Sequence, residues 1–394
     1  MSDGAPSSPP DSRVSLATVG REWTRLGCVG FGGPPTHIAL LRRMCVNERR
    51  WMEAEEFEDA IAATNLLPGP ASTQLAIFCA WRLRGVMGGI VGGVCFILPG
   101  LAIILAFSAL FLAHHPAHWV LGAAAGAGAA VPAVALHAAW QLVPSSRERA
   151  GRTRSAVVRW TIYATVGGVG AATIGPYLVV VLIGAGLVEV SIRRGGQRTA
   201  KSSRGALLPV AAIHAGALGG VSALAWVALK VGALSYGGGF VIVPIMQHDA
   251  VATYHWMTAA QFLNAVALGQ ITPGPVVQTV AVVGYAAAGV GGGLLAALIA
   301  FAPSFVFVFL GGSRFDTIRA NETIRSFFAG AGPAVIGAIA GSAIPLGLSL
   351  QYLWQVPILA GAGIWLFLLR RGVVSGLLIA GAVGVILALV GLQV

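Results

Sequence analysis

Residues 65–75 read NLLPGPASTQL and residues 270–280 read QITPGPVVQTV, so one Pro-Gly-Pro triplet occurs twice, 205 positions apart. The same shift superimposes other distinctive residues: Gly32 and Gly33 on Gly237 and Gly238, and Trp51 on Trp256. Between residues 27 and 70, thirteen of forty-four positions are identical to their shifted partners, without a gap. Self-similarity over this length indicates that the chain consists of two homologous halves.

The composition of both halves is that of a membrane protein. Only 10% of the residues are charged and 56% are hydrophobic, whereas soluble chains carry about 25% charged residues. Apolar segments long enough, or nearly so, for a spanning helix occupy 86–113, 118–143, 156–175, 176–192, 207–234, 286–312, 327–350, 352–369 and 373–393. Two shorter pairs flank the triplets, 53–66 with 71–84 and 258–271 with 276–289. Together these segments predict an all-α polytopic protein of about ten transmembrane helices.

The basic residues predict how the two halves are oriented. Lys and Arg exceed Asp and Glu by 11, which is 25 − 14. This excess lies in short loops, as in cytoplasmic loops of membrane proteins, and not in a pattern that indicates nucleic-acid binding. At each matched pair of loops only one is basic, and the basic members include 147–154, 314–325 and 370–371. By the positive-inside rule the halves have inverted topology, which is typical of secondary transporters.

A domain organisation follows from the repeat. Residues 1–13 are predicted to be a disordered cytoplasmic tail, 14–192 the first repeat, 193–205 a basic cytoplasmic linker and 206–394 the second repeat. Within the first repeat, residues 14–33 carry Arg21, Glu22 and Arg25, so this segment either spans the membrane or lies along its surface. Pairs of the form Gly-x-x-x-Gly, such as Gly122 with Gly126 and Gly337 with Gly341, predict close helix crossings.

Each Pro-Gly-Pro triplet predicts a break in a helical hairpin, followed by the N-terminus of a new helix. Helix N-termini bind anions, and two breaks at matched repeat positions indicate a transport site near the membrane centre. The predicted substrate-binding residues at the breaks are Asn65, Pro68, Gly69, Pro70, Ser72, Thr73 and Gln74, and Gln270, Thr272, Pro273, Gly274, Pro275, Gln278 and Thr279. The alternatives are purely structural kinks at the breaks and interhelical hydrogen bonds for the polar residues.

A divalent oxyanion would require a cation in addition to the two helix ends. Each helix N-terminus provides roughly +0.5 charge, whereas the desolvation of an ion grows with the square of its charge. The candidate cations are His37, Lys230, Arg42 and Arg82, and the alternative for each is a surface or snorkelling position. Hinge or close-approach positions are expected at Gly32, Gly33, Pro34, Gly237, Gly238 and Gly239. Metal, nucleotide and catalytic motifs are absent from the sequence, so neither a cofactor nor an enzyme is predicted.

The motifs at these positions resemble those of the chromate ion transporter family in its long two-domain form. They are Gly30-Phe31-Gly32-Gly33-Pro34 with His37, Asn65-Leu66-Leu67-Pro68-Gly69-Pro70, Ser235-Tyr236-Gly237-Gly238-Gly239 and Gly269-Gln270-Ile271-Thr272-Pro273-Gly274-Pro275. The resemblance extends over residues 14–390 and departs from the family pattern at two positions. Pro35 replaces the small residue that is usual there, and Gly239 stands where the first half has Pro34.

The resemblance implies a multi-pass protein of the bacterial inner membrane that exports chromate from the cytoplasm and confers chromate resistance. It implies that sulfate, a structural mimic of chromate, competes for the site and that the protein is surrounded by the lipid bilayer. The resemblance does not determine the oligomeric state, and a homodimer is one alternative. The alternatives are a carrier of sulfate or another tetrahedral oxyanion that accepts chromate by mimicry, and an anion channel. Without the resemblance, the residues alone predict only an inverted-repeat secondary transporter with an anion site.

Overall fold

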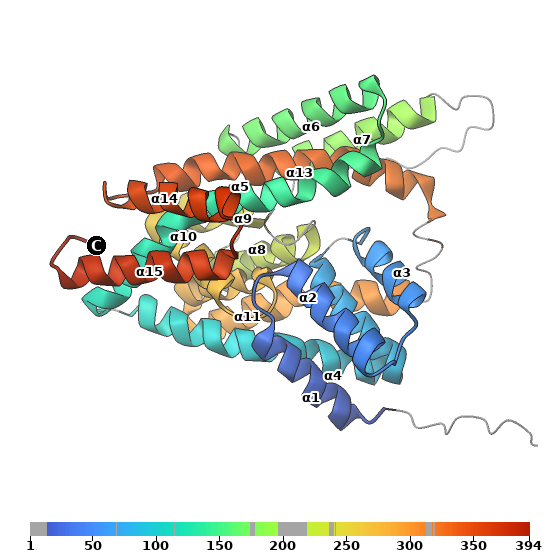
Figure 1. Cartoon of the computed structure of the whole chain (residues 1–394), viewed down its shortest axis with the longest axis horizontal. Helices are drawn as coiled ribbons and strands as arrows, with labels where there is room; N and C mark the ends of the chain where they lie inside the picture. Colours follow the sequence, from blue (N-terminus) through green and yellow to red (C-terminus); the bar gives the residue numbers. More distant parts are fainter. Residues whose placement is uncertain are drawn as a thin grey trace, which may run out of the picture.

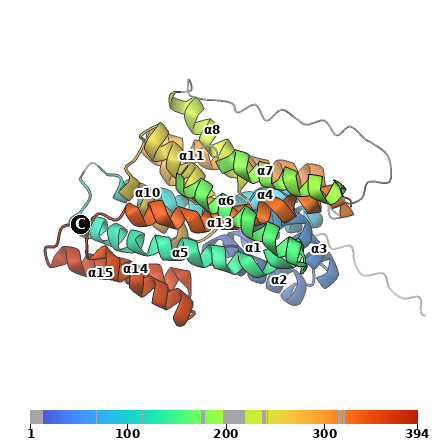
Figure 2. The ribbon, with the colours of Figure 1, turned by 90° about the horizontal axis from the view of Figure 1, so that it is seen from above.

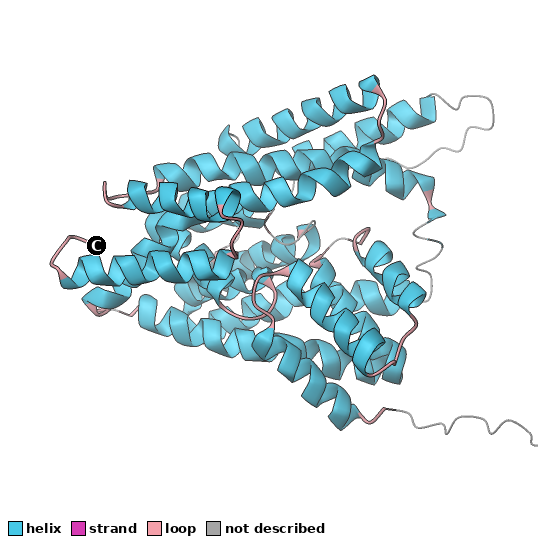
Figure 3. Ribbon diagram, viewed as in Figure 1, coloured by secondary structure: helices cyan, strands magenta, loops and turns pink. Residues whose placement is uncertain are grey.

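The structure is a computed structural model that describes residues 14–67, 69–113, 115–173, 178–195, 219–235, 240, 242–312, 317 and 320–394. All regular elements in these ranges are helical, and the ranges contain no strand (Figure 3). The predicted tail 1–13 and most of the predicted linker 193–205 lie outside the described residues. The predicted all-α class is confirmed for the part of the chain that the structure describes.

The helices follow one another in a closely similar order in the two halves (Figure 1). The first half contains α1 Leu16–Val29, α2 Pro34–Arg42, the π-helical turn η1 Arg43–Glu48, α3 Ala54–Thr64, α4 Ala71–Phe111, α5 His118–Ala150, α6 Arg154–Thr173 and α7 Leu178–Gly195. The second half contains α8 Gly220–Leu234, α9 Ile242–Gln247, η3 His248–Thr253, α10 Ala259–Ile271, η4 Val276–Gln278, α11 Thr279–Gly311, α13 Glu322–Leu348, α14 Gln355–Gly363, η6 Ile364–Leu368 and α15 Val373–Leu389.

Four of the described helices are long and apolar enough to cross a membrane. They are α4, α5, α13, and α11 together with the preceding turn η4. Shorter apolar helices are α8, α15, and α14 together with η6. The chain is thus an apolar helical protein suited to a membrane, and the total of about ten spans stays a prediction based on segment length.

The long helices α4 and α11 are each bent sharply at a matched position. Arg84 and Gly85 leave the helical conformation in α4, and Ala288 and Gly289 leave it in α11 with closely similar angles. Gly85 and Gly289 have φ of 61° and 62°, values that favour glycine because it lacks a Cβ atom. The two arms of each helix pack on one another across the bend. The predicted boundary between segments 71–84 and 86–113 is therefore confirmed.

The turns that follow η1 and η3 are also alike. Trp51 N–H donates to the carbonyl oxygen of Cys45 at 2.7 Å, and Trp256 N–H donates to that of Ala250 at 2.9 Å. The residues before these tryptophans, Arg50 and His255, both have a positive φ, of 51° and 53°. These bonds and angles recur at the 205-residue spacing of the sequence repeat.

The two halves are interlocked by their long helices. α13 of the second half packs along α5, α6 and α7 of the first half, and α5 packs along α13, α14 and α15. Figure 1 shows α5, α6, α7 and α13 with their long axes side by side, and Figure 2 shows α14 and α15 beside α5. A Cβ atom on Gly337 would overlap the carbonyl oxygen of Ala164, and one on Gly126 would overlap that of Ala380. The predicted close crossings at these glycines are confirmed, and a second contact between the halves runs along α4 and α11.

The segment 14–33, which the sequence left undecided, contains the short helix α1, which packs on α4. Glu22 is only 4% exposed, and its carboxylate pairs with Arg49 at 2.5 Å and with Arg21 at 3.3 Å. The indole Nε1 of Trp23 donates to the carbonyl oxygen of Ala76 at 2.8 Å. α1 has 14 residues, and its length of about 21 Å is less than the ~30 Å of a hydrocarbon core. α1 is therefore too short to cross a bilayer by itself.

Two elements differ from the sequence prediction. Residues 34–48 form the helix α2 with η1, although no helix was predicted there. Pro34 and Pro35 occupy the first two helical positions, and the helix can start at them because the fixed φ of proline suits a helix start. α5 continues to Ala150, so Arg147 and Arg149 extend from its last turn and not from a loop. Cations are favourable in this position because the C-terminal end of a helix carries a partial negative charge.

Candidate functional site

The first predicted break lies between α3 and α4. Gly69 has a φ of 119°, and a Cβ atom there would meet the amide nitrogen of Gln74, which folds back over the break. α4 begins directly after Pro70, and the side chains of Ser72, Thr73 and Gln74 in its first turn are all buried. The break and the new helix start are therefore confirmed, while Pro68 lies outside the described residues.

The second break lies between α10 and η4 and repeats this geometry. Gly274 has a φ of 98°, and a Cβ atom there would lie 3.0 Å from Nε2 of Gln278. Gln278 thus takes the place that Gln74 has in the first half, although it is 204 and not 205 positions further on. The slip arises because the helix after Pro275 begins with the 3-10 turn η4, which has fewer residues per turn.

The second break is hydrogen-bonded to the first half around Gly30. The carbonyl oxygen of Gly30 accepts from the backbone N–H of Gly274 at 2.9 Å and from Nε2 of His37 at 2.8 Å. The other ring nitrogen of His37, Nδ1, shares a hydrogen bond with the hydroxyl of Ser72 at 3.2 Å. Nε2 of Gln278 donates to the carbonyl oxygen of Ile97 at 2.9 Å. His37 therefore links the two breaks.

Each break also faces the long helix of the other half, at the residue after a proline. A Cβ atom on Gly100, which follows Pro99, would overlap the carbonyl oxygen of Pro273 in the second break. Ser304 follows Pro303, and its hydroxyl lies 3.4 Å from the position of a Cβ atom on Gly69 in the first break. The two contacts involve matched positions, so both breaks lie at the boundary between the halves.

Several buried polar atoms, most of them on or beside the breaks, have no hydrogen-bond partner among the described residues. They are Thr73 Oγ1, Ser235 Oγ, Gln270 Nε2, Gln278 Oε1 and Ser304 Oγ. A buried polar group without a partner destabilises a protein by about 1–3 kcal/mol. Such groups are therefore expected to find partners in a bound polar ligand or in ordered water. The hydroxyls of Thr73 and Ser304, like that of Ser235, are donors suited to an oxyanion.

Other residues predicted at the breaks are occupied locally. Thr272 Oγ1 donates to the carbonyl oxygen of Leu268 at 2.9 Å, and Thr279 Oγ1 donates to that of Val276 at 2.8 Å. Both are buried, and both bonds lie within their own helical segment. Asn65 caps the C-terminal end of α3 and lines a cavity between this end and α13. These three side chains are thus less available to a ligand at the boundary than Thr73 and Ser304.

Three of the four predicted cations form ion pairs. Arg42 pairs with Glu58 at 2.7 Å, and Arg82 pairs with Glu56. Both arginine side chains are about half exposed, at 48% and 49%. The ammonium group of Lys230, 19% exposed, pairs at 2.5 Å with Asp249, which is 7% exposed. The charge of each of these cations is offset by a carboxylate in the structure.

The Lys230 ion pair allows a test of its role. We expect Lys230→Met alone to destabilise the protein by about 3 kcal/mol, because it leaves the buried carboxylate of Asp249 without a partner. The double variant Lys230→Met with Asp249→Asn should regain most of this stability and should transport normally. Thermal unfolding and substrate uptake of the single and double variants measure both effects. Loss of uptake in a stable double variant would instead assign Lys230 to the substrate site.

The predicted hinge residues of the first half lie next to the second break. Gly32 and Gly33 have φ of 97° and 77°, and Pro34 begins α2 directly after them. A Cβ atom on Gly33 would lie 3.8 Å from Cγ2 of Val276, so this loop contacts the start of η4. Their counterparts Gly237, Gly238 and Gly239 lie outside the described residues.

Gly100 and Ser304, which contact the breaks, were not predicted from the sequence, and neither was the buried Ser235. Pro99 and Pro303 are recognisable as a repeat pair in the sequence, and the residues that follow them are the ones in contact with the breaks. Ser235 occupies the position matched to Gly30. Comparing the neighbours of each repeated motif would therefore have indicated all three.

Comparison with known proteins adds independent information. The family model described as "Chromate transporter" matches residues 17–190 and again residues 222–389. A protein of Cupriavidus metallidurans named "Chromate transport protein" is 31% identical over 380 residues, which covers 93% of this chain and 90% of that protein. A "Probable chromate transport protein" of Synechococcus elongatus is 29% identical, covering 84% of this chain and 85% of its own length. A "Chromate transport protein" of Pseudomonas aeruginosa is 28% identical, with 84% and 81% covered. No solved structure matches the chain.

Proposed function

This chain belongs to the chromate transporter family in its long two-domain form, and from that premise we propose that it exports chromate from the cytoplasm by a secondary mechanism. The relatives are named as transport proteins and not as enzymes. We place the protein in the bacterial inner membrane, in about ten spans that form two repeats of inverted topology. The repeats are residues 14–192 and 206–394, joined by the cytoplasmic linker 193–205.

The observation that supports this function best is the junction of the two Pro-Gly-Pro breaks. Two helix starts, each with a partial positive charge, lie at one boundary between the halves. Buried hydroxyls and the amide nitrogen of Gln270, all of them donors, have no partner among the described residues. A tetrahedral oxyanion accepts hydrogen bonds from all sides, so it complements donors of this kind. We therefore assign the substrate to this junction, with Thr73 and Ser304 as its hydroxyl donors.

An asymmetry between the halves supports alternating access. α10 packs closely on α5, where a Cβ atom on Gly128 would overlap the amide oxygen of Asn264. The matched helix α3 packs on α4, and a cavity separates its C-terminal end from α13. Transport would exchange these two arrangements, so that α3 closes on α13 while α10 leaves α5. The substrate at the junction would then face one side of the membrane at a time.

The charge of chromate favours export over uptake. Moving two negative charges outward from an inside-negative cell is favourable by about 2 × 2.3 kcal/mol per 100 mV. This free energy corresponds to roughly a thousandfold concentration ratio without ATP. A phosphate-binding loop of the Walker type does not occur in the sequence.

The test is uptake of labelled chromate into inside-out vesicles at a set membrane potential. We expect accumulation that increases with a lumen-positive potential, does not require ATP and is blocked by excess sulfate. Vesicles without the protein are the control. Strict dependence on ATP at a fixed potential would contradict a secondary mechanism. Accumulation of sulfate that exceeds that of chromate would identify a sulfate carrier that accepts chromate by mimicry.

A further inference from the structure

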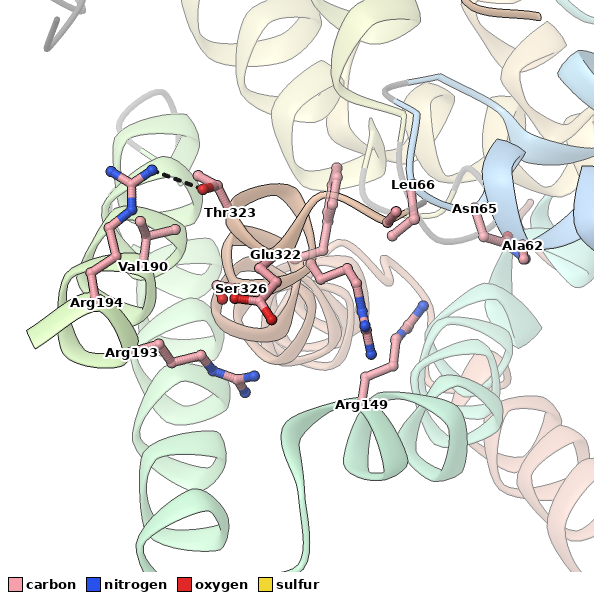
Figure 4. A pocket seen from close by; sticks show the side chains of 13 residues that line it. Ala62, Asn65, Leu66, Arg149, Val190, Arg193, Arg194, Glu322, Thr323 and Ser326 are labelled. Carbon is pink, nitrogen blue, oxygen red and sulfur yellow. Dashed lines mark hydrogen bonds between the residues drawn. The ribbon is translucent and has the colours of Figure 1, made fainter. Parts of the chain in front are cut away.

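A cavity of about 1210 Å³ lies between the first hairpin and α13. On one side it is lined by Ala62, Asn65 and Leu66, at the end of α3 and just before the first break. On the other sides it is lined by the C-terminal turns of α5 and α7 and by the first turns of α13 (Figure 4). The cavity therefore reaches from the ends of three scaffold helices to the loop of the first Pro-Gly-Pro break.

The charged residues in the lining are mostly basic: Arg149, Arg193, Arg194, Arg325 and Glu322. The charge of Arg193 is offset by Glu189, at 2.7 Å, and Arg194 donates to the neutral hydroxyl of Thr323 at 2.8 Å. Arg149, Arg194 and Arg325 form no ion pair with a described residue. Three such arginines less one glutamate leave a surplus of two positive charges at the cavity.

The surplus is assembled from segments that are far apart in the sequence. Arg149 is on α5, Arg194 on α7 and Arg325 on α13, so both halves contribute. Figure 4 shows the side chains of Arg149 and Arg193 directed into the cavity from different helices. These helix ends belong to or adjoin the segments 147–154, 193–205 and 314–325, whose basic character predicts a cytoplasmic location. The cavity therefore opens towards the side from which an exported substrate would come.

We propose that this cavity is a cationic vestibule that attracts the free dianionic oxyanion from the cytoplasm and directs it to the first break. The term cationic vestibule denotes the cavity around Arg149, Arg194 and Arg325. The inference rests on the proposed function, because it concerns how the same substrate reaches the same junction. Clefts lined by charges of one sign raise the local concentration of an oppositely charged ligand and its association rate. Arginine suits this role because its guanidinium group stays charged and matches oxyanion geometry.

The first test is the kinetics of chromate uptake into inside-out vesicles by charge-neutralised variants. We expect Arg149→Gln and Arg325→Gln each to raise KM about two- to fivefold, with the maximal rate unchanged, because a dianion loses one attractive charge at close range. The double variant should approach the product of the two effects and should lose most of the dependence of KM on KCl concentration. Glu322→Gln should act in the opposite direction and lower KM about twofold.

Arg152→Gln is the matched control for these variants. Arg152 is exposed on the turn that follows α5 and does not line the cavity. The substitution removes the same charge on the same predicted face, and we expect it to change KM by less than about twofold. The proposal is overturned if the Arg149 and Arg325 variants behave like this control, or if Glu322→Gln raises KM.

A second measurement separates the vestibule from the transport proposal and from lipid binding. Arginine clusters also bind the phosphate groups of anionic lipids, which share the chemistry of a tetrahedral oxyanion. We would measure chromate binding to the purified protein in nanodiscs of phosphatidylcholine alone and with phosphatidylglycerol. A weaker affinity of the double variant in phosphatidylcholine alone supports the vestibule, even if wild-type vesicles show no net transport. A difference that occurs only with phosphatidylglycerol assigns the arginines to lipid and overturns the proposal.

Discussion

Gly100→Ala is expected to reduce chromate flux by at least about a hundredfold, because a positioned site loses this much activity when its groups are displaced by about 1 Å. The added Cβ atom would overlap the carbonyl oxygen of Pro273 and the side-chain amide of Gln278. α4 and the second break would have to separate to accommodate it. Their separation would also lengthen the bond from Gln278 to the carbonyl oxygen of Ile97. The measurement is the initial rate of uptake into inside-out vesicles, normalised to the amount of protein in the membrane.

Gly184→Ala provides the matched control. Gly184 lies inside α7, and a Cβ atom there would meet no atom within 4 Å. The chemical change is the same, and alanine is a better helix former than glycine by about 1 kcal/mol. We therefore expect normal flux and normal abundance. Wild-type flux in Gly100→Ala would show that transport does not need the close approach of α4 to the second break.

Thr73→Val and Ser304→Ala are expected to raise KM for chromate about 10- to 100-fold without destabilising the protein. Both hydroxyls are fully buried and have no partner among the described residues. A hydrogen bond to a charged group contributes about 1.5–3 kcal/mol, which corresponds to this change in affinity. In the absence of substrate, each substitution removes a buried donor without a partner, so thermal stability should stay the same or increase.

Ser108→Ala distinguishes this effect from a general response to the loss of a hydroxyl. Ser108 is also fully buried on α4, but its hydroxyl donates to the carbonyl oxygen of Ile104 at 2.7 Å. The control should leave KM unchanged and decrease stability by about 1 kcal/mol. If Thr73→Val and Ser304→Ala increase stability but leave KM unchanged, the two hydroxyls do not bind the substrate.

The breaks and bends of this fold can be predicted from the sequence because proline and glycine act locally. Pro70 and Pro275 precede new helix starts, and Gly69 and Gly274 adopt the positive φ that glycine permits. The predicted apolar segments 86–113 and 286–312 likewise begin close to the observed bends in α4 and α11. Local residue chemistry and the 205-residue repeat together account for most helix boundaries.

The parts that could not be predicted depend on contacts between distant segments. The sequence shows that Lys230 is basic and lies in an apolar helix, but not that Asp249 of η3 pairs with it. In the same way, nothing local to Gly100 indicates that its neighbour is the carbonyl oxygen of Pro273. The cavity, too, arises from the separation of α3 and α13, which belong to different halves. The residues alone predict the type of each element, but not which elements pack on one another.

The interlocking of α5 and α13 has a consequence for biosynthesis. The helices that cover α5, α6 and α7 are α13, α14 and α15, which are the last to be translated. The glycine-lined faces of the first half, such as that around Gly126 and that around Gly167, have their partners at Ala380 and Ala334. When translation has completed only the first half, the packing faces of its helices therefore contact lipid, because the helices that cover them have not yet been made. Assembly must wait for the C-terminal helices, and a chain that terminates early should be recognised and degraded as an unassembled subunit would be.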